Sequence, residues 1–340
     1  MNLHLNKQLF RDAIAVTSQQ FDMLPIYVEK DYWVTYALFT IFNNEIGKET
    51  IFKGGTALSK CYNLINRFSE DIDLVVMRRE GETDAKLKIK IRTIGKVLED
   101  HLPEIEIEGL THKMGMNRKT AHSYTKEFKG NYGQIRDVIV IEATWLGYYE
   151  PYTTRLLSSF IGNMMLKNEQ AAIAKKNGML PFEVRVLEPI RTICEKIMSL
   201  VRFSYSEKPI DNLKKKVRHT YDLNQLLQQK EFSDFFNSTA FDEMLMKVAN
   251  ADVASFRNNN KWLNLHPKKA LIFSDLENTW NELKSTYNGE FKELVFGGFP
   301  SAEEIKETLI LIKERLSLIN WTIKVVSERD SENCLSQLKR

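Results

Sequence analysis

The sequence has 340 residues, a formal charge of +3 and an apolar fraction of 43%, as expected for a globular protein with one large or two ordinary domains. The charge is so nearly balanced that any nucleic-acid contact must come from local basic patches. Cys61, Cys194 and Cys334 are scattered and have no CxxC spacing, which argues against a disulfide framework or a zinc site. No apolar run approaches the roughly twenty residues that span a bilayer, and the N-terminus lacks the apolar core of a secretory signal. We therefore expect a cytoplasmic protein without a membrane segment.

Two helices are expected first. Residues 6–20 place their apolar side chains on or near one helical face. Pro25 should interrupt that pattern, and residues 27–42 then predict a strongly apolar helix that packs under a sheet. Its opening, residues 29–31 (Glu-Lys-Asp), should place acidic groups in the first turn, where the helix dipole favours them.

The most informative stretch is residues 51–76, IFKGGTALSKCYNLINRFSEDIDLVV. Residues 51–53 can end a strand, and residues 54–56 (Gly-Gly-Thr) form a turn that opens a helical pattern. Residues 71–76 alternate acidic and apolar side chains before becoming fully apolar. This pattern predicts a buried strand that begins with two carboxylates.

The two carboxylates and the glycine turn suggest a chemistry. Asp71 and Asp73 are two residues apart on a strand, so they point to the same side and repel each other unless a cation compensates. A hard divalent cation, Mg²⁺ or Mn²⁺, is the usual partner of such oxygen ligands. Gly54 and Gly55 allow the backbone to approach a phosphate, which the N–H groups of the following helix can bind. The combination indicates phosphoryl or nucleotidyl transfer.

The next segment is rich in basic residues. Residues 86–98 predict a helix whose basic face is either simply solvated or a nucleic-acid contact surface. That face carries Lys86, Lys88, Lys90, Arg92 and Lys96. Residues 104–108 predict a half-exposed strand. Residues 112–129 predict a polar hairpin or loop beside the active-site face, with His122 as an ordinary surface residue.

Glu142 interrupts the β-branched apolar run of residues 138–145, which predicts a central strand. A lone carboxylate there is costly unless it is paired or binds a cation. The alternative is that Glu142 lies at the exposed end of the strand.

The second half of the chain is mainly helical. Residues 151–177 are mixed, with a helical pattern only at 171–174, and residues 182–187 alternate as a strand. A helix is expected at residues 190–203, with Lys196 flanking its packed face. A polar link should follow at residues 206–216. The later helices are expected at residues 218–227, 241–248, 267–287 and 302–324.

The strings KGGTALSK and RFSEDIDL resemble the AbiEii/AbiGii-type nucleotidyltransferase toxins, within the polymerase-beta-like nucleotidyltransferase superfamily. The superfamily places a Gly-Gly or Gly-Ser turn before an Asp-x-Asp strand. The gap from Gly55 to Asp71 is longer than usual in the superfamily but suits the toxin subgroup. EKDYWVT and LEPIRTICEKIMSL also match that subgroup, and RHTYDL is similar to its Arg-His-x-x-Asp-Leu string, so the resemblance covers about Glu29 to Asp222.

The resemblance implies an α+β fold, with a small mixed-sheet nucleotidyltransferase core, flanking helices and a mostly helical C-terminal lobe. Residues 1–187 would form the catalytic domain and residues 188–340 the helical domain, with the active site in the cleft between them. The expected reaction transfers a nucleoside monophosphate from an NTP to an acceptor hydroxyl and releases pyrophosphate.

The resemblance also assigns roles to individual residues. Asp71 and Asp73 would hold Mg²⁺ or Mn²⁺, and Glu142 would complete the site. Lys196 would contact the triphosphate, and Asp222 would position the attacking group. The residues expected to bind the nucleotide are Lys53, Gly54, Gly55, Thr56, Ser59, Lys196 and Arg218. His219 and Arg218 could instead hold the acceptor nucleic acid.

The resemblance implies that the protein is the toxin of a toxin–antitoxin or phage-defence pair and has a cognate antitoxin. The expected acceptor is RNA, specifically tRNA. Two alternatives stay open. The same site could modify a protein or a small molecule such as an aminoglycoside, or the fold could bind nucleotide or RNA without catalysis. The intact aspartates and glycines of the motif argue against the last alternative.

Overall fold

The computed structural model describes residues 1–113, 115–132, 135–147 and 149–325. The chain divides into two compact units. The first comprises Met1–Thr192 and Glu290–Phe299, and the second comprises Ile193–Gly289 and Pro300–Arg340.

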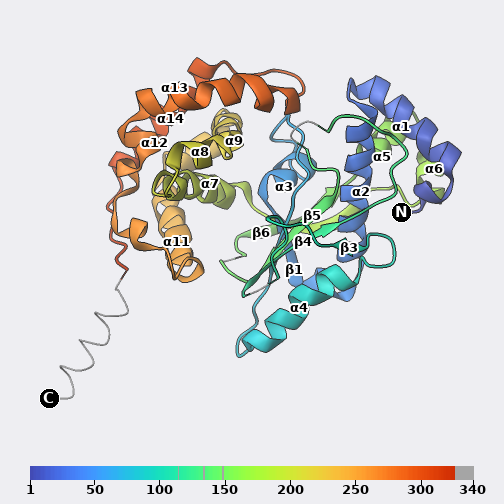
Figure 1. The fold of residues 1–340 in the computed structure, drawn as a ribbon, viewed down its shortest axis with the longest axis horizontal. Coiled ribbons are helices and arrows are strands. Elements are labelled where there is room, and N and C mark those ends of the chain that lie inside the picture. Colours follow the sequence, from blue (N-terminus) through green and yellow to red (C-terminus); the bar gives the residue numbers. More distant parts are fainter. Residues whose placement is uncertain (114, 133–134, 148, 326–340) are drawn as a thin grey trace. The chain divides into compact units, whose positions relative to one another are not determined.

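The first unit contains a seven-stranded sheet with the order β3-β4-β5-β2-β1-β7-β6 (Figure 1). Its strands are β1 (Thr50–Lys53), β2 (Ile72–Val76), β3 (Glu104–Ile105), β4 (Asn117–His122), β5 (Ile139–Thr144), β6 (Tyr152–Leu157) and β7 (Phe182–Leu187). The pairs β2·β5 and β1·β7 are parallel, whereas β1·β2, β4·β5 and β6·β7 are antiparallel. The sheet is therefore mixed, and the expected α+β class is confirmed.

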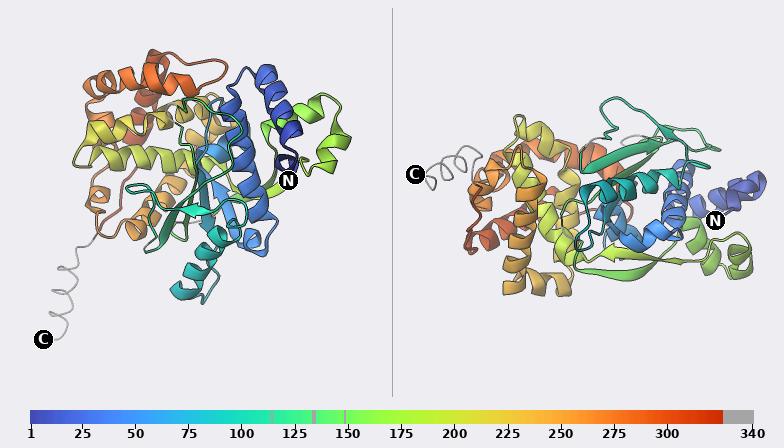
Figure 2. Two further views of the ribbon diagram at one scale, coloured as in Figure 1. Left: turned by 45° about the vertical axis from the view of Figure 1, so that its right-hand side comes forward. Right: turned by 90° about the horizontal axis from the view of Figure 1, so that it is seen from below.

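Helices of the first unit lie against the sheet or against one another (Figure 2). They are α1 (Lys7–Phe21), α2 (Pro25–Phe42), α3 (Gly54–Lys60), α4 (Asp84–Lys96), α5 (Phe160–Lys167) and α6 (Ala171–Lys176). Apolar residues of α1, α2, α4 and α5 join alternate residues of the central strands, such as Phe52, Leu74 and Ile141, in one buried cluster. One face of these strands therefore belongs to the core, while residues of opposite parity project from the other face.

The start of α2 differs from the sequence-based prediction. Pro25 occupies the first turn of the helix, where its missing N–H costs no hydrogen bond, so it starts the helix and does not interrupt the pattern. Glu29, Lys30 and Asp31 consequently lie beyond the first turn, which contains no acidic residue. All three are buried, so the dipole interpretation of this charged triplet was wrong.

His122 was also misassigned. The side chain is fully buried, with Nδ1 2.8 Å from the main-chain oxygen of Leu102 and Nε2 2.9 Å from the hydroxyl of Thr120. Burial lowers the pKa of His122, which favours the neutral ring. This histidine is a hydrogen-bonded core residue of β4 and not a surface residue.

Several other boundaries shift. β3 is limited to Glu104–Ile105, and β4 occupies the middle of the segment 112–129. β6 and α5 were not predicted. β6 is mostly exposed at the sheet edge, so its sequence lacks the apolar alternation that reveals a half-buried strand.

Apart from its first residues, the helix α7 (Pro189–Ser204) belongs to the second unit, which is mainly helical. Its other helices are α8 (Pro209–Lys214), α9 (Val217–Leu227), α10 (Lys230–Phe236), α11 (Thr239–Ser255), α12 (Leu271–Ser274), α13 (Leu276–Thr286) and α14 (Ala302–Ser317). The expected polar link at 206–216 contains α8, the expected helix at 267–287 is divided between α12 and α13, and α14 ends before residue 324. A capping box of Ser301 and Glu304 starts α14.

A late segment of the chain returns to the first unit. The Phe68 N–H donates to the main-chain oxygen of Leu294 at 2.7 Å, and the Phe296 N–H donates to that of Asn66 at 2.9 Å. Sequence patterns gave no sign of this pairing, which holds the segment leading to Asp71.

Two further expectations concern membranes and cysteines. Within the part of the chain that the structure describes, no helix combines the length and apolar character that crossing a membrane requires. Cys61 and Cys194 are buried thiols, and burial raises the pKa of Cys61 to about 12. Cys334 lies outside the described residues.

Candidate active site

Four charged residues form a row across four neighbouring strands. In the sheet register, Lys53 of β1 pairs with Asp73 of β2, Asp73 with Glu142 of β5, and Glu142 with Lys119 of β4. Directly paired residues project from the same face, and adjacent strands are about 4.8 Å apart. Asp73 and Glu142, two of the three predicted carboxylates, are therefore neighbours, with a lysine at each end of the row.

Glu142 has two further contacts within this row. Asn117 Nδ2 donates to Glu142 Oε1 at 3.0 Å, and Lys119 Nζ lies 3.5 Å from Oε2. The Glu142 side chain is 39% exposed. Glu142 therefore lies on a central strand without being buried in an apolar core, and both partners stabilise its charge.

The glycine turn lies directly against Asp73. Gly54 has φ +82°, and a Cβ atom there would be 2.2 Å from Asp73 Oδ2. A Cβ on Gly55 would be 2.4 Å from a guanidinium nitrogen of Arg67. Only glycine combines this backbone conformation with this close approach, so the structure places the turn directly beside the Asp73 carboxylate. Ser59 is half-buried further along α3.

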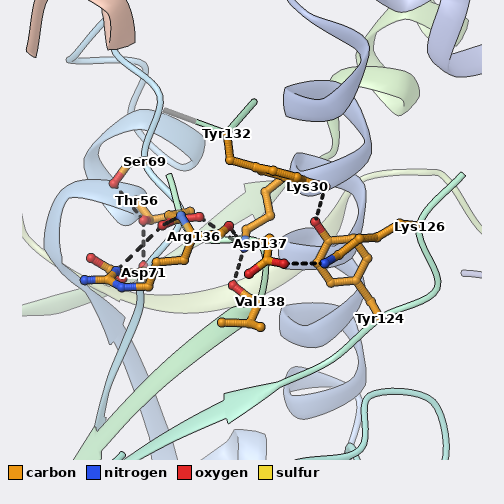
Figure 3. A network of polar contacts seen from close by, with 11 residues as sticks. Lys30, Thr56, Ser69, Asp71, Tyr124, Lys126, Tyr132, Arg136, Asp137 and Val138 are labelled. Atoms are coloured by element: carbon orange, nitrogen blue, oxygen red, sulfur yellow. Dashed lines mark hydrogen bonds and ion pairs between the residues drawn. The ribbon is translucent and has the colours of Figure 1, made fainter. Parts of the chain in front are cut away.

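Asp71 is fixed through both its backbone and its side chain (Figure 3). The Thr56 hydroxyl donates to the main-chain oxygen of Asp71 at 2.6 Å and lies 2.9 Å from Ser69 Oγ. The guanidinium of Arg136 donates to Asp71 Oδ1 at 2.9 Å. The hydroxyl of Thr56 thus supports Asp71. A phosphate would therefore have to bind to the main-chain N–H of Thr56 and not to its hydroxyl.

A buried ion pair of Lys30 and Glu70 contacts the main chain of Arg136; Figure 3 shows Lys30 and Arg136. The side chain of Lys30 is 0% exposed, and its Nζ is 3.0 Å from Glu70 Oε2. Lys30 also donates to the main-chain oxygens of Arg136, at 2.8 Å, and Val138, while Glu70 Oε1 accepts the Arg136 N–H at 2.9 Å. Desolvation lowers the pKa of Lys30 and raises the pKa of Glu70.

These contacts join α2 to two segments near the candidate site, the one that precedes β2 and the one that precedes β5. Sequence reasoning missed Lys30, Glu70 and Arg136 as supports of Asp71. The available signal was a charged triplet within an otherwise apolar helix, which signifies paired charges when the helix is buried.

Lys196 and Asp222 come together within the second unit. Lys196 Nζ is 2.7 Å from Asp222 Oδ2, and the two side chains are 6% and 0% exposed. The two side chains therefore form a buried ion pair between α7 and α9. Arg218 and His219, at the start of α9, are half-buried.

The predicted metal ligands Asp71, Asp73 and Glu142 suit a divalent cation by the type of their donor atoms. In the described ranges, no group of three or more His, Cys, Asp or Glu side chains is close enough to hold a metal ion. Asp73 and Glu142 are nevertheless paired on adjacent strands, Asp71 directly precedes β2, and all three supply the hard oxygen donors that Mg²⁺ requires. They fit such an ion in donor type, provided that Asp71 exchanges its contact with Arg136 for the cation.

Comparison with known proteins identifies the family. The profile of the family described as "Nucleotidyl transferase AbiEii toxin, Type IV TA system" matches residues 36–307. The chain belongs to the AbiEii nucleotidyltransferase toxin family. None of the curated proteins matches the chain. As an AbiEii member it is a nucleotidyltransferase, and the type IV toxin–antitoxin class implies an NTP substrate and an antitoxin partner.

A solved structure supports the fold of this AbiEii protein. MenT4, a nucleotidyltransferase toxin from Mycobacterium tuberculosis H37Rv, is similar with a TM-score of 0.58 and 14% sequence identity. The similarity covers 96% of this chain and 98% of MenT4. At this identity the similarity concerns the fold alone.

Proposed function

We propose that this AbiEii-family protein transfers a nucleoside monophosphate from an NTP to a hydroxyl group of RNA, with tRNA as the expected acceptor and a divalent cation as cofactor. The observation that carries the proposal is the pairing of Asp73 with Glu142 on adjacent strands, beside a glycine turn whose backbone touches Asp73. Carboxylates next to a backbone turn are what an NTP with its cation needs.

The first unit supplies most of the proposed groups. Asp71, Asp73 and Glu142 would hold Mg²⁺ or Mn²⁺, which when bound neutralises charge on the phosphates and the leaving group. Lys53 ends β1 in register with Asp73, so its ammonium can bind the triphosphate. The main-chain N–H groups of Gly54, Gly55 and Thr56 would bind phosphate oxygens, and Ser59 is a further candidate for this role.

The remaining assignments rest on the resemblance of the segments LEPIRTICEKIMSL and RHTYDL. Lys196 would contact the triphosphate, Asp222 would position the acceptor, and Arg218 would bind phosphate. In the transfer, the acceptor hydroxyl loses its proton and its oxygen bonds to the α-phosphorus. The bond from the α-phosphorus to the bridging oxygen breaks, and pyrophosphate leaves.

Labelled NTPs, Mg²⁺ and total tRNA test the proposal. We expect label on RNA from the wild type and, for Asp73→Asn, a loss of at least about 100-fold, because a carboxylate that holds charge at the phosphates is removed. Asp137→Asn is the matched control, since Asp137 is exposed and pairs with Lys126.

Each alternative has its own result in this assay. Label on a protein or on a small molecule, and not on RNA, would show that this molecule is the acceptor. NTP binding without label on any acceptor would show a non-catalytic domain.

The proposed biology is that of a toxin whose reaction takes place in the cytoplasm, where NTPs and tRNA meet. Expression of the wild type should arrest growth, and Asp71→Ala should relieve the arrest at equal protein level. Arrest that persists in Asp71→Ala would contradict toxicity by catalysis and indicate sequestration of a cellular component.

A further inference from the structure

A cavity of about 230 Å³ lies between α4 and the polar end of β4. We propose that it binds a phosphate group of the acceptor RNA strand, an inference that rests on the proposed function for the identity of that strand. Its lining includes four cationic side chains, an asparagine and a tryptophan. These are Lys88, Arg92, Lys113, Arg118, Asn117 and Trp145.

The cavity lining has buried donors that need acceptors. Trp145 is 6% exposed, and its indole N–H has no hydrogen-bond acceptor among the residues that the structure describes. The same is true of the Arg118 Nε–H. Two buried N–H groups without acceptors at one cavity are uncommon in a stable fold, and a phosphate supplies oxygen acceptors for both.

The cavity also carries an excess of positive charge. Glu104 partly neutralises Lys113 and Arg118, to whose nitrogens its carboxylate oxygens lie at 2.8 Å. Lys88 and Arg92 are exposed, four residues apart on one face of α4, and form no ion pair with any described residue. A cavity with two uncompensated cations favours an anion over a neutral ligand.

Asn117 connects the cavity to the carboxylate row. It lines the cavity and donates to Glu142, yet Arg118, the next residue along β4, projects from the opposite face of the sheet from Lys119 and Glu142. The cavity is therefore separate from the Gly54 turn, where the triphosphate is expected. A ligand that reaches both the row and the cavity must pass around the end of β4, which a polynucleotide strand can do.

One further group favours RNA. Asn117 Oδ1 is buried and has no donor among the described residues, while Nδ2 is fixed on the Glu142 carboxylate. A ribose 2′-hydroxyl can donate to such an oxygen. The cavity thus presents donors for phosphate and an acceptor for ribose.

The test compares two double variants of the full chain by fluorescence anisotropy with labelled tRNA, without NTP. K88A/R92A should weaken binding at least about tenfold at 0.1 M salt, and the slope of log affinity against log salt should shrink by about 0.7 to 0.9, the value for one phosphate contact. K175A/K176A is the control because it removes the same charge from exposed lysines of α6. It should leave the slope unchanged.

A third variant tests the buried donors. W145F keeps a buried aromatic ring and removes the pyrrole part of the indole with its N–H, so RNA affinity should fall by about tenfold, as for the loss of one charge-assisted hydrogen bond. The KM for NTP in all three variants should match the wild type.

The proposal is overturned if K88A/R92A binds RNA like K175A/K176A, or if the wild type does not bind RNA. It is also overturned if the KM for NTP rises while RNA affinity is unchanged, since the cavity would then hold nucleotide. A wild type that binds RNA through this cavity but does not label it would instead remove the proposed function and leave the cavity assignment standing.

Discussion

At the residue scale, each carboxylate of the candidate site has a cationic side chain beside it. Lys53 and Lys119 flank Asp73 and Glu142 in the sheet register, and Arg136 holds Asp71. Each cation compensates part of the negative charge of its neighbour. A divalent ion at the proposed site would compete with these side-chain cations for the carboxylates.

Gly54 should be the least replaceable residue of the turn. Gly54→Ala requires a positive φ from an L-residue, which costs about 1–2 kcal/mol, and its Cβ would displace the Asp73 carboxylate. We expect the free energy of unfolding, measured with urea, to fall by that amount. The rate of nucleotidyl transfer should fall on the order of 100-fold. Gly81→Ala is the matched control, since Gly81 has φ +72° with no atom within 4 Å of a Cβ. Equal activity in both variants would disprove the importance of the contact with Asp73.

At the scale of elements, α2 holds the surroundings of the candidate site in place. Glu29 accepts the main-chain N–H of Glu127 at 2.7 Å, and Asp31 pairs with Lys60 of α3. Lys30, between them, reaches both Glu70, which precedes Asp71, and the main chain of Arg136. Consecutive positions of a helix point in different directions, about 100° apart, so one charged triplet on a buried helix can fix several segments at once.

Lys30→Met should be strongly destabilising because it leaves Glu70 buried without its cation. We expect a loss of about 3–5 kcal/mol at neutral pH, as for a broken buried ion pair. The pKa of Glu70 is already raised above its ordinary value of 4.5, and the variant should raise it further. Because the folded state then prefers the protonated carboxyl, the penalty should be small near that ordinary pKa and grow as pH rises through the folded pKa.

Urea unfolding at pH 5 and pH 8 measures this pH dependence. The double variant Lys30→Met/Glu70→Gln is the control, since it has no carboxyl to titrate at this position. The stability gap between single and double variants should be wider at pH 8, and an equal gap at both values would contradict the assignment.

The Lys196–Asp222 pair joins α7 to α9 inside the second unit, so the loss of either charge confounds structure with function. Lys196→Ala should cost about 3–5 kcal/mol whatever its role in the reaction. The double variant Lys196→Met/Asp222→Leu replaces the pair with apolar groups and should be near neutral in stability.

Activity of that double variant decides the role of the pair. A stably folded variant without nucleotidyl transfer would support the predicted part of Lys196 and Asp222 in the reaction. A stably folded and fully active one would show that the pair is structural.

At the scale of the whole molecule, chain order and structural unit do not coincide. Residues 290–299 belong to the first unit although residues 193–289 of the second precede them. Arg67 and Val295 form an isolated β-bridge beside the hydrogen bonds of Phe68 and Phe296. Order in the segment before Asp71 therefore depends on residues more than two hundred positions later.

Hydrogen exchange should reveal this dependence. The amides of Phe68 and Phe296 should exchange at similar rates, and Phe296→Pro should accelerate exchange at Phe68, because it removes the donor to Asn66. A segment 294–296 that exchanges with α13 and independently of residues 66–68 would contradict the pairing.

Much of the central region could be predicted from sequence because its signals are local. The glycine turn, the Asp-x-Asp strand and the apolar strand around Glu142 each reveal themselves through spacing and alternation over a few residues. His122 and β6 could not be predicted in this way. A polar residue buried by hydrogen bonds and an exposed edge strand both break the pattern that links apolar character to burial.

The sequence by itself determined the α+β class, the family and the residues of the carboxylate motif, since motif spacing and residue type are properties of the chain. Only the tertiary structure decided that Asp73 lies in register with Glu142, that Lys30 contacts both Glu70 and the main chain of Arg136, and that residues 290–299 return to the first unit. Such partners are distant in sequence, and the packing that desolvates their charges selects them, which no local pattern encodes.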